Sequence, residues 1–539
     1  MKKTDILLIL ILILSIALRF FYLGKIPNGF YSDEAAYGYN AYSILKTGRD
    51  EYGNFLPLAF KSFGDYKAPL YIYFMVPFVW IFGLTEYSVR LSSVVLGIGS
   101  IFLIYHLTKK LFQTNSIPLL SAFLIATSPF ALQYNRMAHE NNLVLFLITL
   151  SILLFFISFK KPKYLILSLI TFAGSIYAYH DTKIFTPLIL VTLFILYRKN
   201  IRINKYTTIK AIIIFLLLLA PFFKSINDKN NWSRALYTNI FTDKGIVYEI
   251  NQEIGENIES GFNAPKIFHN KVISYTQKLI ENYLKQFSPE FIFIFDDPTK
   301  IYQIGGSGIL YLTTLPFLLL GIYIFFRKNL NHKWLIFLWL GISPLPAVFT
   351  RLVPSSSRII SFLPVISIII AIGYLSSLPY IKNNFSRKIY IIILSVIFTL
   401  NISYYLHYYY FNTPIRFAHE WHYGMKEVIG DVLKVQNKYS QVWFSKTAWG
   451  YIYPLFYMKY PPDIYQTQAK LSALNEFGFG WIDNFGKYTF ADIPDKLYRR
   501  PEVLYIGDVS DFPDIKKPLN TVYYPDNHVA FYLADQTSF

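Results

Sequence analysis

Cysteine is absent from the 539 residues, and charged residues make up only 16% of them. The missing cysteine excludes disulfide bonds, thiolate metal sites and thiol nucleophiles, and it leaves the redox compartment undecided. Soluble domains carry charge on about 25% of their residues, so the shortage of charge indicates that lipid is the solvent. The hydrophobic fraction of 54% also indicates a protein embedded in lipid. The sequence therefore predicts an integral membrane protein.

Acidic residues are also scarce beside basic ones, which gives a net charge of +18. This excess could indicate nucleic-acid binding, but its distribution follows membrane topology. Eleven apolar stretches are candidates to cross about 30 Å of hydrocarbon. They lie at 5–23, 87–107, 115–133, 142–159, 164–180, 184–197, 210–225, 307–326, 334–350, 359–378 and 389–408.

The basic residues alternate in density from one connection to the next. If the N-terminus is cytoplasmic, it and every second connection hold 18 Lys and Arg and one acid, Asp5, whereas the remaining residues include 33 basic and 32 acidic ones. This is the pattern of the positive-inside rule. We therefore expect a cell-membrane protein with a cytoplasmic N-terminus and no nucleic-acid partner. The first stretch could instead be a cleaved signal peptide, but it is too long and residues 20–23 offer no cleavage site.

With a cytoplasmic N-terminus, two long loops, 24–86 and 226–306, and the C-terminal segment 410–539 lie on the outer face. The apolar run 69–82 within the first loop has about 14 residues and contains Pro77, and Gly83 follows it. Counting it as a span would place the later basic loops outside, so we predict an interfacial or re-entrant helix.

The C-terminal segment differs from the rest in its pattern. An amphipathic helix pattern at about 415–436 precedes short strand-like runs at 441–445, 503–506 and 528–533, with turn-type residues between them. We therefore predict an all-α polytopic membrane domain over 1–409, with about 11 transmembrane helices, and a small extracytoplasmic α/β domain over 410–539.

The adjacent carboxylates of Asp33 and Glu34 follow the first span by about ten residues. Such pairs are usually only solvated, but a carboxylate placed on an acceptor hydroxyl can act as a general base. Lys67 precedes Pro69 at the start of the apolar run, where an ammonium group beside free backbone N–H groups would suit an anion. The alternative for Lys67 is a side chain that reaches to lipid headgroups.

Further ionisable residues lie at the outer ends of the predicted spans. Each could be only an interfacial anchor, but all face the same compartment. They are Arg136, His139, Glu140, His180, Lys183 and Arg358. A carboxylate base with several cations suits displacement of a sugar from a lipid-linked phosphate, because phosphate is a good leaving group and the cations need only stabilise its charge. A single displacement would invert the anomeric centre.

His419 and His422 have the spacing of half a zinc site, but no third ligand is evident and cysteine is absent. A structural helix surface is the preferred interpretation. We predict no metal site and no required cofactor, while a divalent metal remains an alternative.

The order and spacing of these motifs resemble the GT-C glycosyltransferases over about residues 1–380. Asp33-Glu34 is similar to the acidic signature of that family. The run 67–71 and then 88–91 resemble the following stretch of dolichyl-phosphate-mannose–protein mannosyltransferase-like and aminoarabinose-transferase-like enzymes. Ala68 departs from a Lys-Pro-Pro-Leu pattern, and Tyr66 stands where aminoarabinose transferases carry an acid, which weakens that substrate and a metal site.

The resemblance implies a GT-C fold, a polyprenyl-phosphate-linked sugar donor and transfer at the outer face. It implies that Asp33 is the base, that Glu34 assists acceptor placement and that Lys67 contacts the donor phosphate. Lys183 and Arg358 would be weaker phosphate contacts, and Glu140 would be a second acid in the site.

The sequence thus predicts a membrane glycosyltransferase whose acceptor is a surface glycan, lipid or protein. One alternative is a transporter or flippase for lipid-linked sugars, although such proteins usually carry ionisable residues near the bilayer midplane and the predicted spans here are almost devoid of them. Another is a sensor or assembly protein that binds glycan without catalysis. That protein would have Asp33 and Lys67 directed away from any shared cavity.

Overall fold

The computed structural model describes residues 3–63, 65–202, 204–226, 237–295, 297–303, 305–446, 450–473 and 480–539. Lys2 and the stretch 227–236 of the predicted second loop fall outside these ranges. The chain forms two compact units, each assembled from three separate segments. The first unit comprises Met1–Ile13, Gly99–Ala131 and Val144–Ile402, and the second comprises Leu14–Ile98, Leu132–Leu143 and Ser403–Phe539.

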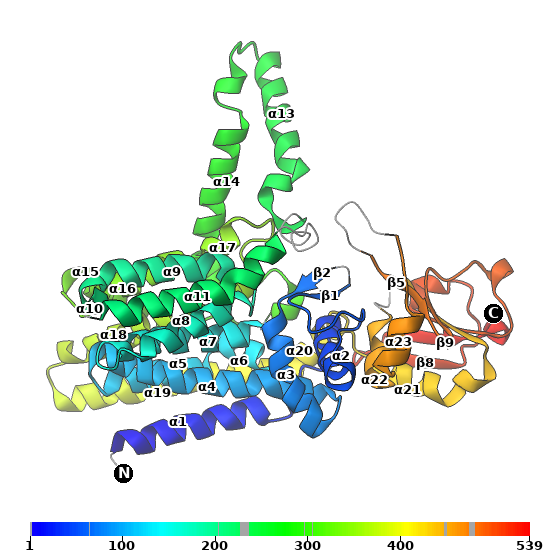
Figure 1. Cartoon of the computed structure of the whole chain (residues 1–539), viewed down its shortest axis with the longest axis horizontal. Helices are drawn as coiled ribbons and strands as arrows, with labels where there is room; N and C mark the ends of the chain where they lie inside the picture. Colours follow the sequence, from blue (N-terminus) through cyan, green and yellow to red (C-terminus); the bar gives the residue numbers. More distant parts are fainter. Residues whose placement is uncertain are drawn as a thin grey trace. The chain divides into compact units, whose positions relative to one another are not determined.

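The first unit is a bundle of apolar helices (Figure 1). Apart from two helices between residues 244 and 285, the helices wholly within it are α5 (Ser116–Thr127), α8 (Tyr164–Ile176), α9 (Thr182–Leu196), α10 (Arg198–Arg202), α11 (Lys205–Ile226), α15 (Leu315–Arg327), α16 (Lys333–Ile342), α17 (Leu345–Val348) and α18 (Phe362–Ser377). Helices that run from one unit into the other are α1 (Lys3–Phe20), α4 (Glu86–Phe112), α6 (Pro129–Arg136), α7 (Asn141–Ser158) and α19 (Asn384–His407).

Helix α18 is the central helix of this bundle, since its residues 362–373 are all buried. A helix that is apolar all round must be surrounded by other helices or lipid. Glycine allows its closest contact: a Cβ atom on Gly321 of α15 would collide with Ile369 of α18, and one on Gly373 would collide with Phe317. Small residues at such crossings let two backbones pack directly against each other, as membrane helices commonly do.

The predicted number of about 11 spans is not confirmed. Five described helices are long and apolar enough to cross a membrane, and the pair α5 and α6, bent by 56°, could make a sixth. Five further apolar helices have only 10–17 residues. In the predicted span 334–350, α16 and α17 together extend only over Lys333–Val348.

The predicted short helix over 69–82 is present as α3 (Pro69–Phe82). Proline suits its first position, because the first N–H groups of a helix have no partner within it. Gly83 follows the last turn with a φ of 72°, a conformation that glycine adopts without strain. The bounds agree with the sequence pattern, and the position of α3 relative to a membrane stays a prediction.

The second predicted loop contains two helices of its own, α13 (Lys244–Glu259) and α14 (Lys271–Lys285), which extend as a pair from the rest of the first unit (Figure 1). Ile246 and Ile250 of α13 pack against Tyr275 and Leu279 of α14. This contact buries Ile246 and Ile250 of α13, while other apolar side chains of the pair, such as Tyr248 and Val272, stay exposed.

The second unit contains a seven-stranded mixed sheet in the order β4-β5-β6-β3-β7-β9-β8. The strands are β3 (Gln441–Phe444), β4 (Lys470–Leu471), β5 (Ile482–Phe485), β6 (Tyr488–Phe490), β7 (Val503–Gly507), β8 (Asn520–Tyr523) and β9 (Val529–Ala534). Strand β7 is buried at every residue, as expected for a strand with neighbours on both edges and both faces covered. The predicted strands near 441, 503 and 528 correspond to β3, β7 and β9.

The amphipathic helix predicted at 415–436 begins later than expected, as α21 (Met425–Val435). His422 and Gly424 both have positive φ, 51° and 95°, which interrupts a right-handed helix. Two further helices, α22 (Ile452–Tyr457) and α23 (Pro462–Gln468), follow β3. The compact unit that holds this sheet also includes residues 14–98, and the proposed boundary near 409 stays a prediction.

Candidate functional site

The carboxylates of Asp33 and Glu34 lie in the first turn of α2 (Ser32–Thr47) and not on an open loop. Glu34 caps this helix by accepting a hydrogen bond from the backbone N–H of Tyr31, at 3.3 Å. Negative charge is favourable here because the first N–H groups of a helix carry partial positive charge. Successive residues of a helix point about 100° apart, so the two carboxylates face different surroundings.

Asp33 forms an ion pair with Lys67, with 2.5 Å between Oδ1 and Nζ. Lys67 ends β2 (Asp65–Lys67), which pairs antiparallel with β1 (Phe60–Ser62). Its ammonium group also lies over the rings of Tyr37 and Phe63, at 4.9 and 6.0 Å from their centroids. The Lys67 side chain is only 3% exposed, whereas that of Asp33 is 37% exposed. An accessible carboxylate therefore lies beside a sheltered cation.

Glu34 is fully buried and bound on both oxygens. Arg90 of α4 donates from Nε to Oε1 at 3.1 Å and from Nη2 to Oε2 at 3.0 Å. The backbone N–H of Ala138 also donates to Oε1, at 2.8 Å. Arg90 completes its bonds at the carbonyls of Pro27 and Gly29. Glu34 therefore connects three segments of the second unit, a geometry that favours positioning of α2 over contact with an acceptor.

Arg136 is buried in the same unit, and its guanidinium binds backbone carbonyl groups. It donates to the carbonyl oxygens of Leu18, Arg19 and Ile26, at 2.9 to 3.0 Å, and to the Tyr409 hydroxyl at 3.3 Å. The carbonyls at the end of α1 lack helical partners. Arg136 supplies those partners.

His139 and Glu140 follow closely in the chain and are also buried, at 6% and 2% exposure. The Nδ1 atom of His139 accepts a hydrogen bond from the backbone of Asn141 at 3.1 Å. This bond attaches the His139 ring to the first residue of α7.

The other three predicted site residues belong to the first unit and are partly exposed. Nζ of Lys183 lies 3.1 Å from Nδ1 of His180 and 5.3 Å from the ring centroid of Phe222. Arg358 donates to the hydroxyl of Thr350 at 2.8 Å and to a backbone carbonyl. Six predicted site residues thus lie in the second unit and three in the first.

His422 was missed as a candidate, because its i,i+3 spacing from His419 favoured a shared helix surface. The two residues in fact differ: His419 is 80% exposed, whereas His422 hydrogen bonds to the Tyr453 hydroxyl at 2.5 Å. Tyr453 donates to the carbonyl of Phe30 at 2.9 Å. Since a hydroxyl has one proton, Nδ1 of His422 must be the donor to Tyr453. Burial lowers the pKa of His422 to about 4, against the opposing charge of Asp33.

His422→Asn is expected to make the protein less sensitive to acid. A partly buried imidazole whose pKa is lowered stays neutral in the folded protein, so the wild type loses stability as the pH falls from about 6.5 towards 4. Asparagine retains an N–H donor and tolerates positive φ. Melting temperatures of both proteins between pH 4 and 7 measure the difference. A wild-type curve that stays flat over this range, or equal slopes in the two proteins, would contradict the assignment.

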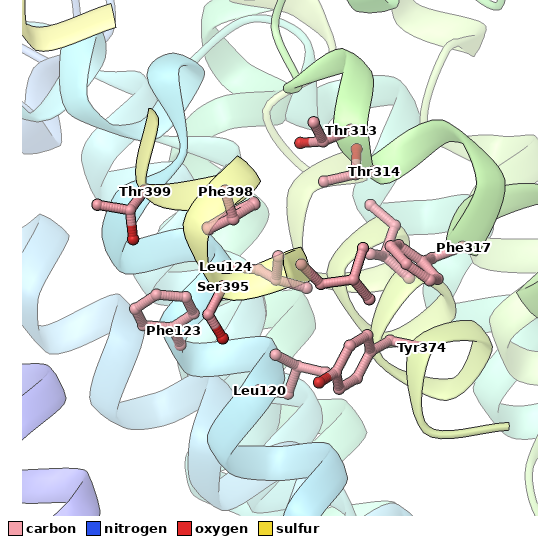
Figure 2. Close-up of a pocket in the computed structure, with 12 residues that line it drawn as sticks. Leu120, Phe123, Leu124, Thr313, Thr314, Phe317, Tyr374, Ser395, Phe398 and Thr399 are labelled. Atoms are coloured by element: carbon pink, nitrogen blue, oxygen red, sulfur yellow. The ribbon is translucent and has the colours of Figure 1, made fainter. Parts of the chain in front are cut away.

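The first unit contains an apolar cavity of about 210 Å³ (Figure 2). Side chains of Phe123 on α5, Phe317 on α15, Tyr374 on α18 and Phe398 on α19 surround it. The residues with hydroxyl groups in its lining are Thr313, Thr314, Tyr374, Ser395 and Thr399, and none of its lining residues is charged. A hydrocarbon chain fits such a cavity better than a sugar or a phosphate does.

In the described ranges no three His, Asp or Glu side chains come together as a possible metal site, and metal dependence stays a prediction. The structure places the ammonium group of Lys67 against the Asp33 carboxylate.

Comparison with known proteins identifies the fold. Residues 66–223 match the family model of dolichyl-phosphate-mannose-protein mannosyltransferase. The crystal structure of ArnT from Cupriavidus metallidurans bound to undecaprenyl phosphate superimposes with a TM-score of 0.57 at 10% identity, over 97% of each chain. The chain has the GT-C glycosyltransferase fold.

One further structure and one further sequence are similar to this chain. The oligosaccharyltransferase AglB from Archaeoglobus fulgidus, in complex with an inhibitory peptide and a dolichol-phosphate, matches with a TM-score of 0.50 and 12% identity, over 100% of this chain and 75% of that one. YycA of Bacillus subtilis (strain 168), named as a candidate mannosyltransferase, is 26% identical over 152 residues. That match covers 28% of this chain and 21% of the relative's length. The resemblance inferred from the motifs is thereby confirmed.

Proposed function

We propose that this chain is a membrane glycosyltransferase that transfers a sugar from a polyprenyl-phosphate donor to an acceptor hydroxyl group. The observation that supports it most directly is the pair of Asp33 and Lys67 on a GT-C fold. A carboxylate that solvent reaches can accept a proton, and an ammonium group beside it can stabilise a phosphate. The relatives bound to undecaprenyl phosphate and dolichol-phosphate favour this class of donor.

The proposed reaction is a single displacement with inversion. Asp33 removes the proton of the acceptor hydroxyl as its oxygen attacks the anomeric carbon. The bond between that carbon and the phosphate oxygen breaks, and the lipid phosphate leaves with the electron pair. Lys67 stabilises the charge that develops on the phosphate, so no strong general acid is required.

The other predicted site residues make different contacts and are therefore given different proposed roles. Glu34 and Arg136 hold the segments around α2 in place, since each is buried and forms hydrogen bonds with several segments of the chain. Lys183 and Arg358 are proposed as weaker phosphate contacts, and His139, Glu140 and His180 as further substrate-binding residues. The apolar cavity of Figure 2 is proposed to hold part of a lipid chain.

The proposed location is the cell membrane, with Asp33 on its extracytoplasmic side. The basic connections support this orientation through the positive-inside rule. The acceptor would be a surface glycan, lipid or protein.

The function is tested with the purified chain in lipid nanodiscs and a panel of undecaprenyl-phosphate hexoses and pentoses. We expect release of undecaprenyl phosphate with at least one donor once a cell-envelope extract supplies acceptors. No release across the panel would contradict the proposal. Movement of labelled lipid across a bilayer without release would favour a flippase instead.

Lys67→Met is expected to raise KM for the donor about tenfold to a hundredfold, since a charge-assisted hydrogen bond is worth about 1.5–3 kcal/mol. Initial rates at varied donor concentration measure this effect. Lys61→Met is the matched control: Lys61 belongs to the same hairpin but lies over the Tyr52 ring. Equal donor KM in the Lys67 variant and the wild type would contradict the phosphate contact.

A further inference from the structure

Glu51 is a fully buried acid that the proposed reaction does not use. Its Oε1 atom accepts a hydrogen bond from the Tyr451 hydroxyl at 3.2 Å, and its backbone N–H donates to Asn40 at 3.1 Å. Its Oε2 atom is buried and has no hydrogen-bond partner within the described ranges. A carboxylate with one free oxygen is costly to bury, whereas a neutral carboxylic acid is much less so.

The hydroxyl group of Tyr451 connects Glu51 to the hairpin that carries Lys67. It donates to Glu51 and accepts from the backbone N–H of Phe63, at 3.3 Å. The ring of Phe63 packs on Tyr451 at 5.2 Å and lies beneath the ammonium group of Lys67. Contacts between residues about 390 positions apart thus hold Phe63, which directly follows β1.

We propose that Glu51 is a positioning residue that determines whether Lys67 remains with Asp33. While Glu51 is neutral, Asp33 is the carboxylate that holds Lys67 in place, at 2.5 Å. Once ionised, Glu51 would become a second, buried carboxylate that attracts the same ammonium group. This inference rests on the proposed role of Lys67 as a phosphate contact.

The electrostatic surroundings agree with this geometry. Burial, and then the neighbouring Asp50, raises the pKa of Glu51 to about 8, while the Tyr451 hydrogen bond, the charge of Lys67 and the side chain of Asn40 oppose the shift. Glu51 is therefore neutral at pH 7 and ionises in the mildly alkaline range. The titratable and charged groups that face it are Asp50, Lys67, Lys61, Tyr39, Tyr52, Tyr451 and Tyr465.

The coupling is tested by infrared titration of the full chain in nanodiscs. Subtracting the spectrum of Glu51→Gln isolates the carboxylic-acid band of Glu51. We expect a band at pH 7 that disappears with a midpoint near 8. In a Lys67→Met background the midpoint should move upward by about one unit or more, because an opposite charge nearby favours ionisation. Absence of the band at pH 7, or an unmoved midpoint, would overturn the proposal.

Controls separate this coupling from general effects of burial. Asp297→Asn removes another buried acid, one that binds Ser356, and should leave the Glu51 midpoint unchanged. If Glu51→Gln fails to fold, the wild-type spectrum is compared with Tyr451→Phe, whose lost hydrogen bond should raise the midpoint. A midpoint that Tyr451→Phe leaves in place would also overturn the proposal.

Kinetics then connect the coupling to the reaction. In the wild type, KM for an undecaprenyl-phosphate sugar should rise about tenfold from pH 7 to pH 9, whereas Glu51→Gln should retain neutral activity and lose this rise. Identical pH profiles would overturn the positioning role. Absence of turnover would refute the proposed function separately, since the infrared measurement needs no substrate.

Discussion

Asp33→Asn is expected to lower kcat about 10²- to 10⁴-fold, the usual contribution of a general base. Asparagine has nearly the shape of aspartate but cannot take up the proton of the acceptor hydroxyl. Because the Lys67 side chain is only 3% exposed, removal of its partner charge should also lower the stability, although the 37% exposure of Asp33 limits the loss. Single-turnover rates with a lipid-phosphate sugar, together with the melting temperature, separate chemistry from stability.

The matched control is Asp514→Asn. Asp514 is 29% exposed and pairs with Arg499, which is 5% exposed, so the burial of this pair resembles that of Asp33 and Lys67. Both pairs belong to the second unit, and Asp514 has no part in the proposed reaction. If Asp33→Asn retained full turnover, or if Asp514→Asn lost as much, Asp33 would not be the base.

The parts of the fold that follow from local pattern were predictable. The helix over 69–82 has the expected bounds because proline and glycine define its ends. Asp33 and Lys67 are 34 residues apart within one predicted loop, which made their proximity a reasonable expectation. The number of spans was not predictable to the same degree, since proline and polar residues divide apolar stretches into shorter helices.

The candidate site was less predictable because many of its contacts join distant residues. Tyr451 reaches Glu51 across 400 positions, and Tyr453 reaches Phe30 across 423. Hydropathy and residue spacing do not predict which distant residues will form such hydrogen bonds. Arg136 illustrates the same difficulty: its place at the end of a predicted span suggested substrate binding, yet it donates to carbonyl groups at the end of α1.

Arg90→Met is expected to destabilise the protein by about 3–5 kcal/mol, because it leaves the buried carboxylate of Glu34 without its cation. The side chains of Arg90 and Glu34 are both 0% exposed. Two of the bonds that Arg90 makes hold Glu34 in the first turn of α2, the turn that also carries Asp33. Turnover of the folded fraction should therefore fall as well. Unfolding in nanodiscs and single-turnover rates measure the two effects.

The double variant Glu34→Leu with Arg90→Met tests whether the loss comes from an uncompensated charge. Replacing both members of a buried ion pair by apolar residues is often nearly neutral, whereas removing one partner is not. The double variant should therefore be more stable than Arg90→Met alone, and the difference measures the coupling of the two residues. If the effects of the two substitutions on stability are additive, the carbonyl contacts of Arg90 with Pro27 and Gly29 contribute more to stability than its ion pair with Glu34 does. Turnover that recovers with stability would mean that the Glu34 carboxylate acts only by holding α2, whereas a stable but inactive double variant would place that carboxylate in the reaction itself.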